Sequence, residues 1–164
     1  MRRIPISILF IIIFSFCNAK NAQGKIIINE IGAYEKTNSE WIEIYNNGDE
    51  AIDITGWKFY EDGIHHAIHP LSGDLIINPK EYAVIAQKGD IFLLEKNFSG
   101  KIFDSSWGSL TEEGEEIGLK DAQGNIIELF TYISSPNYSL ERANPDLFEY
   151  SETNWKEHVN GNSA

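Results

Sequence analysis

EWIEIYNNGDEAIDITGWKF, residues Glu40–Phe59, is the stretch that decides the expected fold. Its first part, Trp41–Tyr45, concentrates aromatic and β-branched residues in a run of strand length. Asn46–Asp49 then supplies residue types that are common in turns, and Ala51–Ile54 resumes the alternation of apolar and polar residues. The stretch therefore predicts two strands around a polar turn.

Short runs of the same kind, separated by turn residues, continue through the rest of the chain. Regular spacing of this kind is typical of an antiparallel sandwich or barrel. A hairpin is expected where Ala122-Gln123-Gly124 separates two alternating runs. The expected strands are Lys25–Ile31, Glu40–Asn46, Ala51–Tyr60, Ile64–Ile68, Asp74–Ile77, Tyr82–Gln87, Lys101–Asp104, Glu115–Asp121, Asn125–Tyr132, Tyr138–Ala143 and Trp155–Val159.

One segment favours a short helix, near residues 90–96. Asp90 is a suitable N-cap, and Ile91 and Leu94 lie three residues apart, on one side of a helix. Four consecutive apolar residues also fit a buried strand, so both structures remain open for this segment.

Several segments form a recognisable series in their order along the chain. They are Ile28–Ile31, Trp41–Asn46, Leu75–Ala86, Gly114–Gly124, Ser139–Arg142 and Trp155. This series resembles the lamin-tail domain family, whose members are immunoglobulin-like β-sandwiches found at the end of nuclear lamins and in many secreted bacterial proteins. The resemblance implies an all-β, immunoglobulin-like antiparallel sandwich over residues 28–164, and a role in binding rather than a reaction.

The amino terminus has the pattern of a secretory signal peptide over residues 1–19. Two arginines precede an apolar run that is shorter than the ~20 residues needed to span a bilayer, and small residues follow the run. Cleavage after Ala19 would leave residues 20–27 as a short leading segment, whereas cleavage before Cys17 would produce a lipoprotein. The protein is therefore expected to be exported from a bacterial cell, to the periplasm, the cell surface or the medium.

Acidic residues dominate the charge. The chain has 25 acidic and 13 basic residues, and loss of Arg2 and Arg3 with the signal would leave 11 basic residues and a formal charge of −14. A negative field of this size repels phosphate backbones, which argues against nucleic acid as a partner. A protein or another envelope component is the expected partner.

The largest side chains are expected to be structural. Trp41, Trp57, Trp107 and Trp155 are predicted in the core or at its edge, with a sugar-stacking platform as the alternative. Arg142 follows Leu140 in an expected strand and is predicted to form a structural ion pair with Glu43 or Glu30.

Glu30 and Glu43 are also the residues of a possible acid pair. Two carboxylates suggest a carbohydrate-active hydrolase, but that chemistry needs a defined separation and a raised pKa on one of them. Neither can be read from the sequence, so no catalytic residue is predicted.

Metal binding is the remaining chemistry to weigh. His65, His66 and His69 alternate between the two faces of an expected strand, which places two imidazoles too far apart for one zinc ion. The turn that begins at Asn46 and Asn47 is rich in oxygen ligands for calcium, yet ordinary turns use the same residue types. No metal ligand and no cofactor is therefore predicted.

The sequence as a whole predicts a non-catalytic exported β-sandwich for binding, adhesion or anchoring at the cell envelope. A small calcium-assisted or carbohydrate-active hydrolase is the first alternative. A structural module that associates with itself through an uncovered sheet edge is the second.

Overall fold

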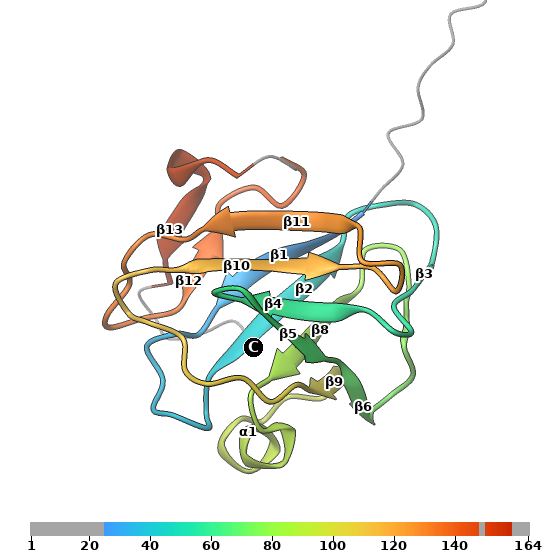
Figure 1. Ribbon diagram of the computed structural model, residues 1–164, viewed down its shortest axis with the longest axis horizontal. Coiled ribbons are helices and arrows are strands. Elements are labelled where there is room, and N and C mark those ends of the chain that lie inside the picture. Colours follow the sequence, from blue (N-terminus) through green and yellow to red (C-terminus); the bar gives the residue numbers. More distant parts are fainter. Residues whose placement is uncertain (1–24, 148–149, 159–164) are drawn as a thin grey trace, which may run out of the picture.

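The computed structural model describes residues 25–147 and 150–158, and these residues form mainly short β-strands (Figure 1). The elements are β1 Ile26–Ile31, β2 Trp41–Asn46, β3 Ile52–Asp53, β4 Lys58–Glu61, β5 Ile64–Ala67, β6 His69–Ser72, β7 Ile76–Ile77, β8 Tyr82–Ala86, α1 Gly89–Glu95, β9 Lys101–Asp104, β10 Glu116–Lys120, β11 Ile126–Thr131, β12 Leu140–Arg142, the 3-10 helix η1 Glu152–Asn154 and β13 Trp155–Glu157. The predicted signal segment 1–19, with Cys17, and most of the segment 20–27 lie outside the described residues.

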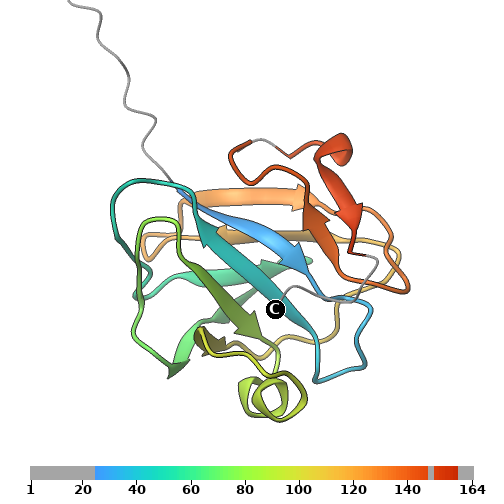
Figure 2. The same cartoon turned by 180° about the vertical axis from the view of Figure 1, so that it is seen from behind.

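Two sheets pack against each other as a sandwich, which confirms the predicted immunoglobulin-like class (Figures 1 and 2). The seven-stranded sheet has the order β13-β12-β1-β2-β8-β9-β6, and the four-stranded sheet has the order β11-β10-β4-β5. Strands β3 and β7 form a separate pair. One pair, β8 with β9, is parallel, in contrast to the antiparallel pairing that was predicted throughout.

The main core lies between the two sheets. Alternate residues of each strand point into it, so that Ile42 and Ile44 of β2 meet Phe59 of β4 and Ile117 and Leu119 of β10. Each fully buried side chain of this size contributes about 1.5–3 kcal/mol. Strand β2 forms where a strand was predicted, with residues 42 and 44 facing inward and residues 41, 43 and 45 facing the other way.

A second, smaller core covers part of the opposite face of the seven-stranded sheet, which we call the outer face. Helix α1 lies at the end of β8 (Figure 2), and Phe92 of α1 and Phe98 of the loop after it pack against this face. The buried members of this second core are Trp41, Val84, Ala86, Phe92 and Ile102.

The predicted strand 51–60 is wrong as a single element. It is divided into β3, which pairs with β7, and β4, which belongs to the four-stranded sheet. The break lies at Gly56, whose φ of 77° places the backbone in the left-handed region that glycine tolerates. Asp53 Oδ1 accepts a hydrogen bond from the Thr55 amide at 2.8 Å, which stabilises the turn.

A strand was missed between residues 69 and 72. The chain leaves the four-stranded sheet after β5, passes through the buried Ile68, and enters the seven-stranded sheet as β6. Pro70 within this segment has no amide donor, which is tolerated because β6 is an edge strand.

The short helix α1 forms where a helix was favoured, at Gly89–Glu95. The predicted N-cap is wrong, because Lys88 occupies that position and Asp90 lies in the first turn. The Asp104 carboxylate of β9 instead accepts a hydrogen bond from the Gly89 amide at 2.8 Å. No helix in the described part of the chain is long and apolar enough to cross a membrane.

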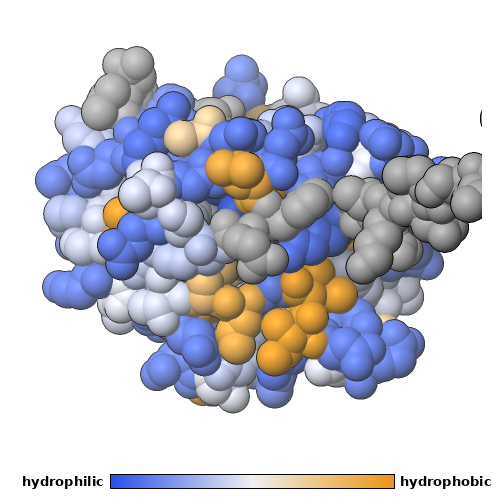
Figure 3. Space-filling model, turned by 90° about the horizontal axis from the view of Figure 1, so that it is seen from above, coloured by the Kyte–Doolittle hydropathy of each residue, from blue (hydrophilic) through white to orange (hydrophobic). Residues whose placement is uncertain are grey.

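The predicted hairpin is confirmed by β10 and β11, in which Ile117 pairs with Phe130. Gly124 has a φ of 87° in the connecting turn. Strand β11 is an edge strand that exposes Ile126 and Leu129. Figure 3 looks down on this side of the molecule and shows a few apolar groups within a largely hydrophilic surface.

The last strand, β13, begins at Trp155 as predicted and ends at Glu157. Its predicted end at Val159 lies outside the described residues.

Candidate functional site

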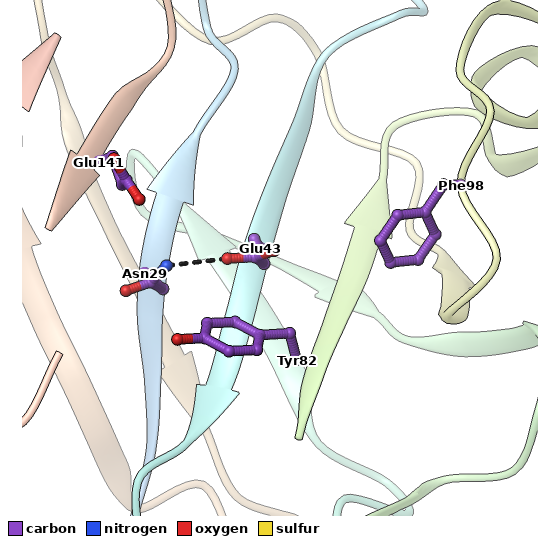
Figure 4. Close-up of a pocket in the computed structure, with 5 residues that line it drawn as sticks. All are labelled: Asn29, Glu43, Tyr82, Phe98 and Glu141. Atoms are coloured by element: carbon purple, nitrogen blue, oxygen red, sulfur yellow. Dashed lines mark hydrogen bonds between the residues drawn. The ribbon is translucent and has the colours of Figure 1, made fainter. Parts of the chain in front are cut away.

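A half-open pocket of about 360 Å³ lies on the outer face of the seven-stranded sheet. Four of its lining residues come from four neighbouring strands, β12, β1, β2 and β8, and the fifth comes from the loop after α1 (Figure 4). We call it the outer-face pocket. It is lined by Asn29, Glu43, Tyr82, Phe98 and Glu141.

An irregularity in β1 brings Asn29 and Glu30 to this face. The register with β2 shifts between Ile28 and Glu30, which leaves Asn29 as the extra residue of a β-bulge. The bulge allows Ile28 and Ile31 both to face the main core, although they are three residues apart. The two polar residues between them are consequently turned toward the outer face.

Three glutamates form a row across adjacent strands. Glu141 of β12 pairs in register with Glu30 of β1, and Glu30 pairs with Glu43 of β2. We call these three residues the glutamate row. Directly opposed like charges destabilise a sheet, so this arrangement costs folding free energy. Such costs are common at functional sites.

Several neighbouring groups contact the row. Ser139 Oγ donates a hydrogen bond to the Glu30 carboxylate at 2.5 Å. Lys156 Nζ lies 3.8 Å and His158 Nε2 lies 4.0 Å from a carboxylate oxygen of Glu141. These groups act at the β12 side of the row, away from Glu43.

Glu43 of β2 has a perturbed pKa. Only 5% of its surface is exposed, and this burial raises the pKa of its carboxyl to about 7. A hydrogen bond of 2.8 Å from Asn29 Nδ2 to Glu43 Oε1 acts in the opposite direction on the pKa, whereas the charges of Glu30 and Glu141 raise it further. Glu43 therefore changes its charge near neutral pH.

Glu43 is expected to make the stability of the protein depend on pH. Because its pKa is higher in the folded than in the unfolded chain, the folded state is favoured while Glu43 is protonated, and this advantage is lost as the pH rises from about 4.5 to about 7. The loss is on the order of 3 kcal/mol. Glu43→Gln keeps an oxygen for Asn29 but does not ionise, so the variant should be more stable than wild type at high pH.

Urea unfolding of both proteins at about pH 5 and about pH 8 measures this effect. The difference between Glu43→Gln and wild type should grow with pH. A difference that is the same at both pH values would show that the Glu43 carboxyl has an ordinary pKa.

Aromatic rings form the other walls of the pocket. Tyr82 stacks on Tyr45 with ring centroids 4.3 Å apart. Phe98 makes an edge-to-face contact of 6.0 Å with Phe92, which in turn contacts Trp41 at 6.1 Å. The second core therefore supports the wall that Phe98 provides.

Arg142 forms a buried ion pair, as predicted, but not with Glu43 or Glu30. Its partner is Glu128 of β11 in the other sheet. Arg142 lies two residues after the core residue Leu140, so its side chain points inward, whereas Glu43 and Glu30 face outward. The ion pair therefore crosses the sandwich.

The four tryptophans lie mainly in the interior of the fold. Trp41 and Trp155 are buried, and Trp57 is partly buried against the main core. Trp107 is buried and donates a hydrogen bond of 2.9 Å to Glu40. The Glu40 carboxylate also accepts a bond from the Leu110 amide, so it anchors the loop after β9, a role that sequence reasoning missed.

The residues that were weighed as metal ligands, and not predicted to be such, do not come together as a site. His65 and His66 lie on β5 of one sheet, and His69 begins β6 of the other. The side chains of Asn46 and Asn47 are used within the fold, where they bond to backbone groups. Within residues 25–147 and 150–158, no group of three or more His, Cys, Asp or Glu side chains is arranged to hold a metal ion.

Comparison with known families identifies the fold. The sequence profile of the Lamin Tail Domain family matches residues 19–134, which include β1 to β11 and most of the outer-face pocket, but not Glu141 or Arg142. A search of curated proteins found no match. Lamin tail domains are immunoglobulin-like modules that are generally non-catalytic. Because the match covers well over half of the chain, the protein belongs to the lamin tail domain family.

Proposed function

We propose that this protein is an exported, non-catalytic module that binds a component of the cell envelope through the outer-face pocket. The observation that carries the proposal is the glutamate row, which places like charges on three adjacent strands beside a pocket. A row of this kind lowers the free energy of unfolding of a protein that binds nothing there, whereas a ligand that offsets its charge would reduce the repulsion.

The family supports a binding role, because lamin tail domains are generally non-catalytic. The predicted signal segment over residues 1–19 supports export. Cleavage near Ala19 would release the module, and lipidation of Cys17 would tether it to a membrane. In both cases the outer-face pocket would be presented outside the cytoplasm.

The acidity of the protein supports the choice of partner. The formal charge of −12 for the full chain disfavours binding to nucleic acids and to anionic lipid surfaces. A protein or another envelope component with positive charge would be attracted by the same field.

Photo-cross-linking in the native host tests the proposal. A photo-reactive residue replaces Tyr82, which lines the pocket and is 40% exposed. The matched control replaces Ile64, which is 59% exposed on β5 of the other sheet. We expect an envelope component to be captured from position 82 and not from position 64.

A further inference from the structure

The amide of Asn29 has one oxygen that is buried without a partner. Asn29 is 4% exposed, and its Nδ2 donates to Glu43. Its Oδ1 has no hydrogen-bond partner among the described residues. Figure 4 shows this oxygen pointing away from Glu43, to the side of β1 on which Glu141 lies. A buried acceptor of this kind lowers the stability of the fold unless a donor reaches it.

The polar atoms that converge here are mainly acceptors. Two carboxylates, from Glu43 and Glu141, line the pocket together with the free oxygen of Asn29. None of the five lining residues carries a positive charge. A complementary ligand would therefore bring several N–H donors and a positive charge.

The aromatic walls favour the same kind of ligand. The rings of Tyr82 and Phe98 line the pocket beside the acidic groups. Aromatic faces attract ammonium and guanidinium groups, and they also pack against the methylene chain that carries such a group. The pocket volume of about 360 Å³ suits a ligand of that size.

On the basis of the proposed function, we propose that the outer-face pocket binds an alkylammonium or alkylguanidinium group, the chemistry carried by a lysine or arginine side chain. Glu43 and Glu141 supply the counter-charge, and Asn29 Oδ1 accepts one N–H. Tyr82 and Phe98 flank the alkyl chain. The bound cation offsets the repulsion within the glutamate row.

Titration of the isotope-labelled protein with small probes, followed by NMR of the backbone amides, tests this assignment. The probes are n-butylamine and n-butylguanidine, with n-butanol as the neutral control of similar size. Both cations should produce saturable shifts at Asn29, Glu43 and Tyr82, and n-butanol should not. No shift at these positions, or equal shifts with n-butanol, would overturn the assignment.

Two variants make the test specific. Glu43→Gln should bind the cations about tenfold more weakly or worse, because it removes one counter-charge and keeps the shape. Glu113→Gln changes an exposed glutamate before β10 and should bind as wild type does. Equal affinity in Glu43→Gln and wild type would also overturn the assignment. A well-dispersed spectrum of Glu43→Gln shows that the variant is folded.

Binding should also weaken as the pH falls from about 8 to about 5.5, because Glu43 becomes protonated while both probes stay cationic. The groups around Glu43 are Glu30 and Glu141, with Tyr45 and Tyr82 beside them. Lys156 and His158 lie at the β12 end of the row, beside Glu141. Affinity that does not change with pH would contradict a role for the Glu43 carboxylate.

The source of the cation can be distinguished with a third probe. The probe is a lysine whose amino and carboxyl groups are both blocked. A higher affinity for this probe than for n-butylamine indicates that the natural ligand is a protein side chain, and equal affinities indicate a free amine. Failure of all cations, together with capture of an envelope component from position 82, would reject the cationic ligand and leave the proposed function intact.

Discussion

Replacing Arg142 with methionine is expected to lower the free energy of unfolding by about 3–5 kcal/mol, because it leaves the Glu128 carboxylate buried without its counter-charge. The Arg142 side chain is fully buried, and that of Glu128 is 4% exposed. Methionine replaces the aliphatic part of the side chain and none of its donors. Urea unfolding monitored by tryptophan fluorescence measures the change.

The ion pair also completes the hydrogen bonding of β1. Arg142 Nε donates to the Ile28 carbonyl at 2.7 Å, and the Ile28 amide donates to Glu128 Oε2 at 2.7 Å. The pairing of β1 with β12 is confined to Glu30 and Ile31, so the two side chains satisfy backbone groups that no strand reaches on that side. The guanidinium further lies 4.9 Å from the centre of the Trp155 ring.

Two controls separate this effect from a general loss of packing. The double variant Arg142→Met with Glu128→Leu removes both charges and should recover part of the stability. Lys156→Met removes an exposed partner of Glu141 on β13 and should cost less than about 1 kcal/mol. An Arg142→Met protein as stable as Lys156→Met would show that the buried pair does not hold the sheets together.

Trp41→Ala is expected to cost about 3–5 kcal/mol, which is the typical loss for a large aromatic residue in a core. Trp41 is fully buried in the second core, where it contacts Phe92. Its indole also packs on Gly32, since a Cβ atom at Gly32 would lie 2.4 Å from the ring. The loss of the indole removes support from α1 and from the loop that carries Phe98.

Two further substitutions provide stability losses for comparison, measured by thermal or urea unfolding. Trp41→Phe keeps an aromatic ring and should lose less stability than Trp41→Ala. Trp57→Ala removes a partly buried indole and should also lose less. Equal losses for Trp41→Ala and Trp57→Ala would contradict a distinct second core on the outer face.

Elements whose sequence pattern is local could be predicted. Strand β2, the hairpin of β10 and β11, and helix α1 all follow from residues within the element itself. Strand β6 was missed because its edge position, which permits Pro70, depends on the order of strands far apart in the sequence. The division between β3 and β4 was missed at Gly56, a residue that signals a turn.

The candidate site was harder to predict than the strands. Glu30 and Glu43 stood out as acids in apolar strands, but their alignment with Glu141 follows from the order β12-β1-β2, which the sequence does not contain. The signal for the bulge was present, since Asn29 and Glu30 form a polar pair that breaks the alternation of β1. Tyr82 had no local feature that marked it as part of a pocket.

The partner of Arg142 was missed, although the alternation of side chains along a strand indicates on which side it lies. Residues two apart in a strand share a face, and Leu140 belongs to the core. Arg142 therefore points between the sheets, where a partner from the other sheet is needed. Glu128 of β11 is buried, whereas residues 127 and 129 beside it are more exposed, so Glu128 is the acid that faces Arg142.

The central claim, that the outer-face pocket is where this module meets its partner, is tested most directly by photo-cross-linking from position 82 in the native host. The account predicts a discrete adduct with an envelope component, which is lost in Glu43→Gln and absent when the photo-reactive residue stands at position 64. Adducts of equal yield from both positions, or an adduct from position 64 alone, would contradict it.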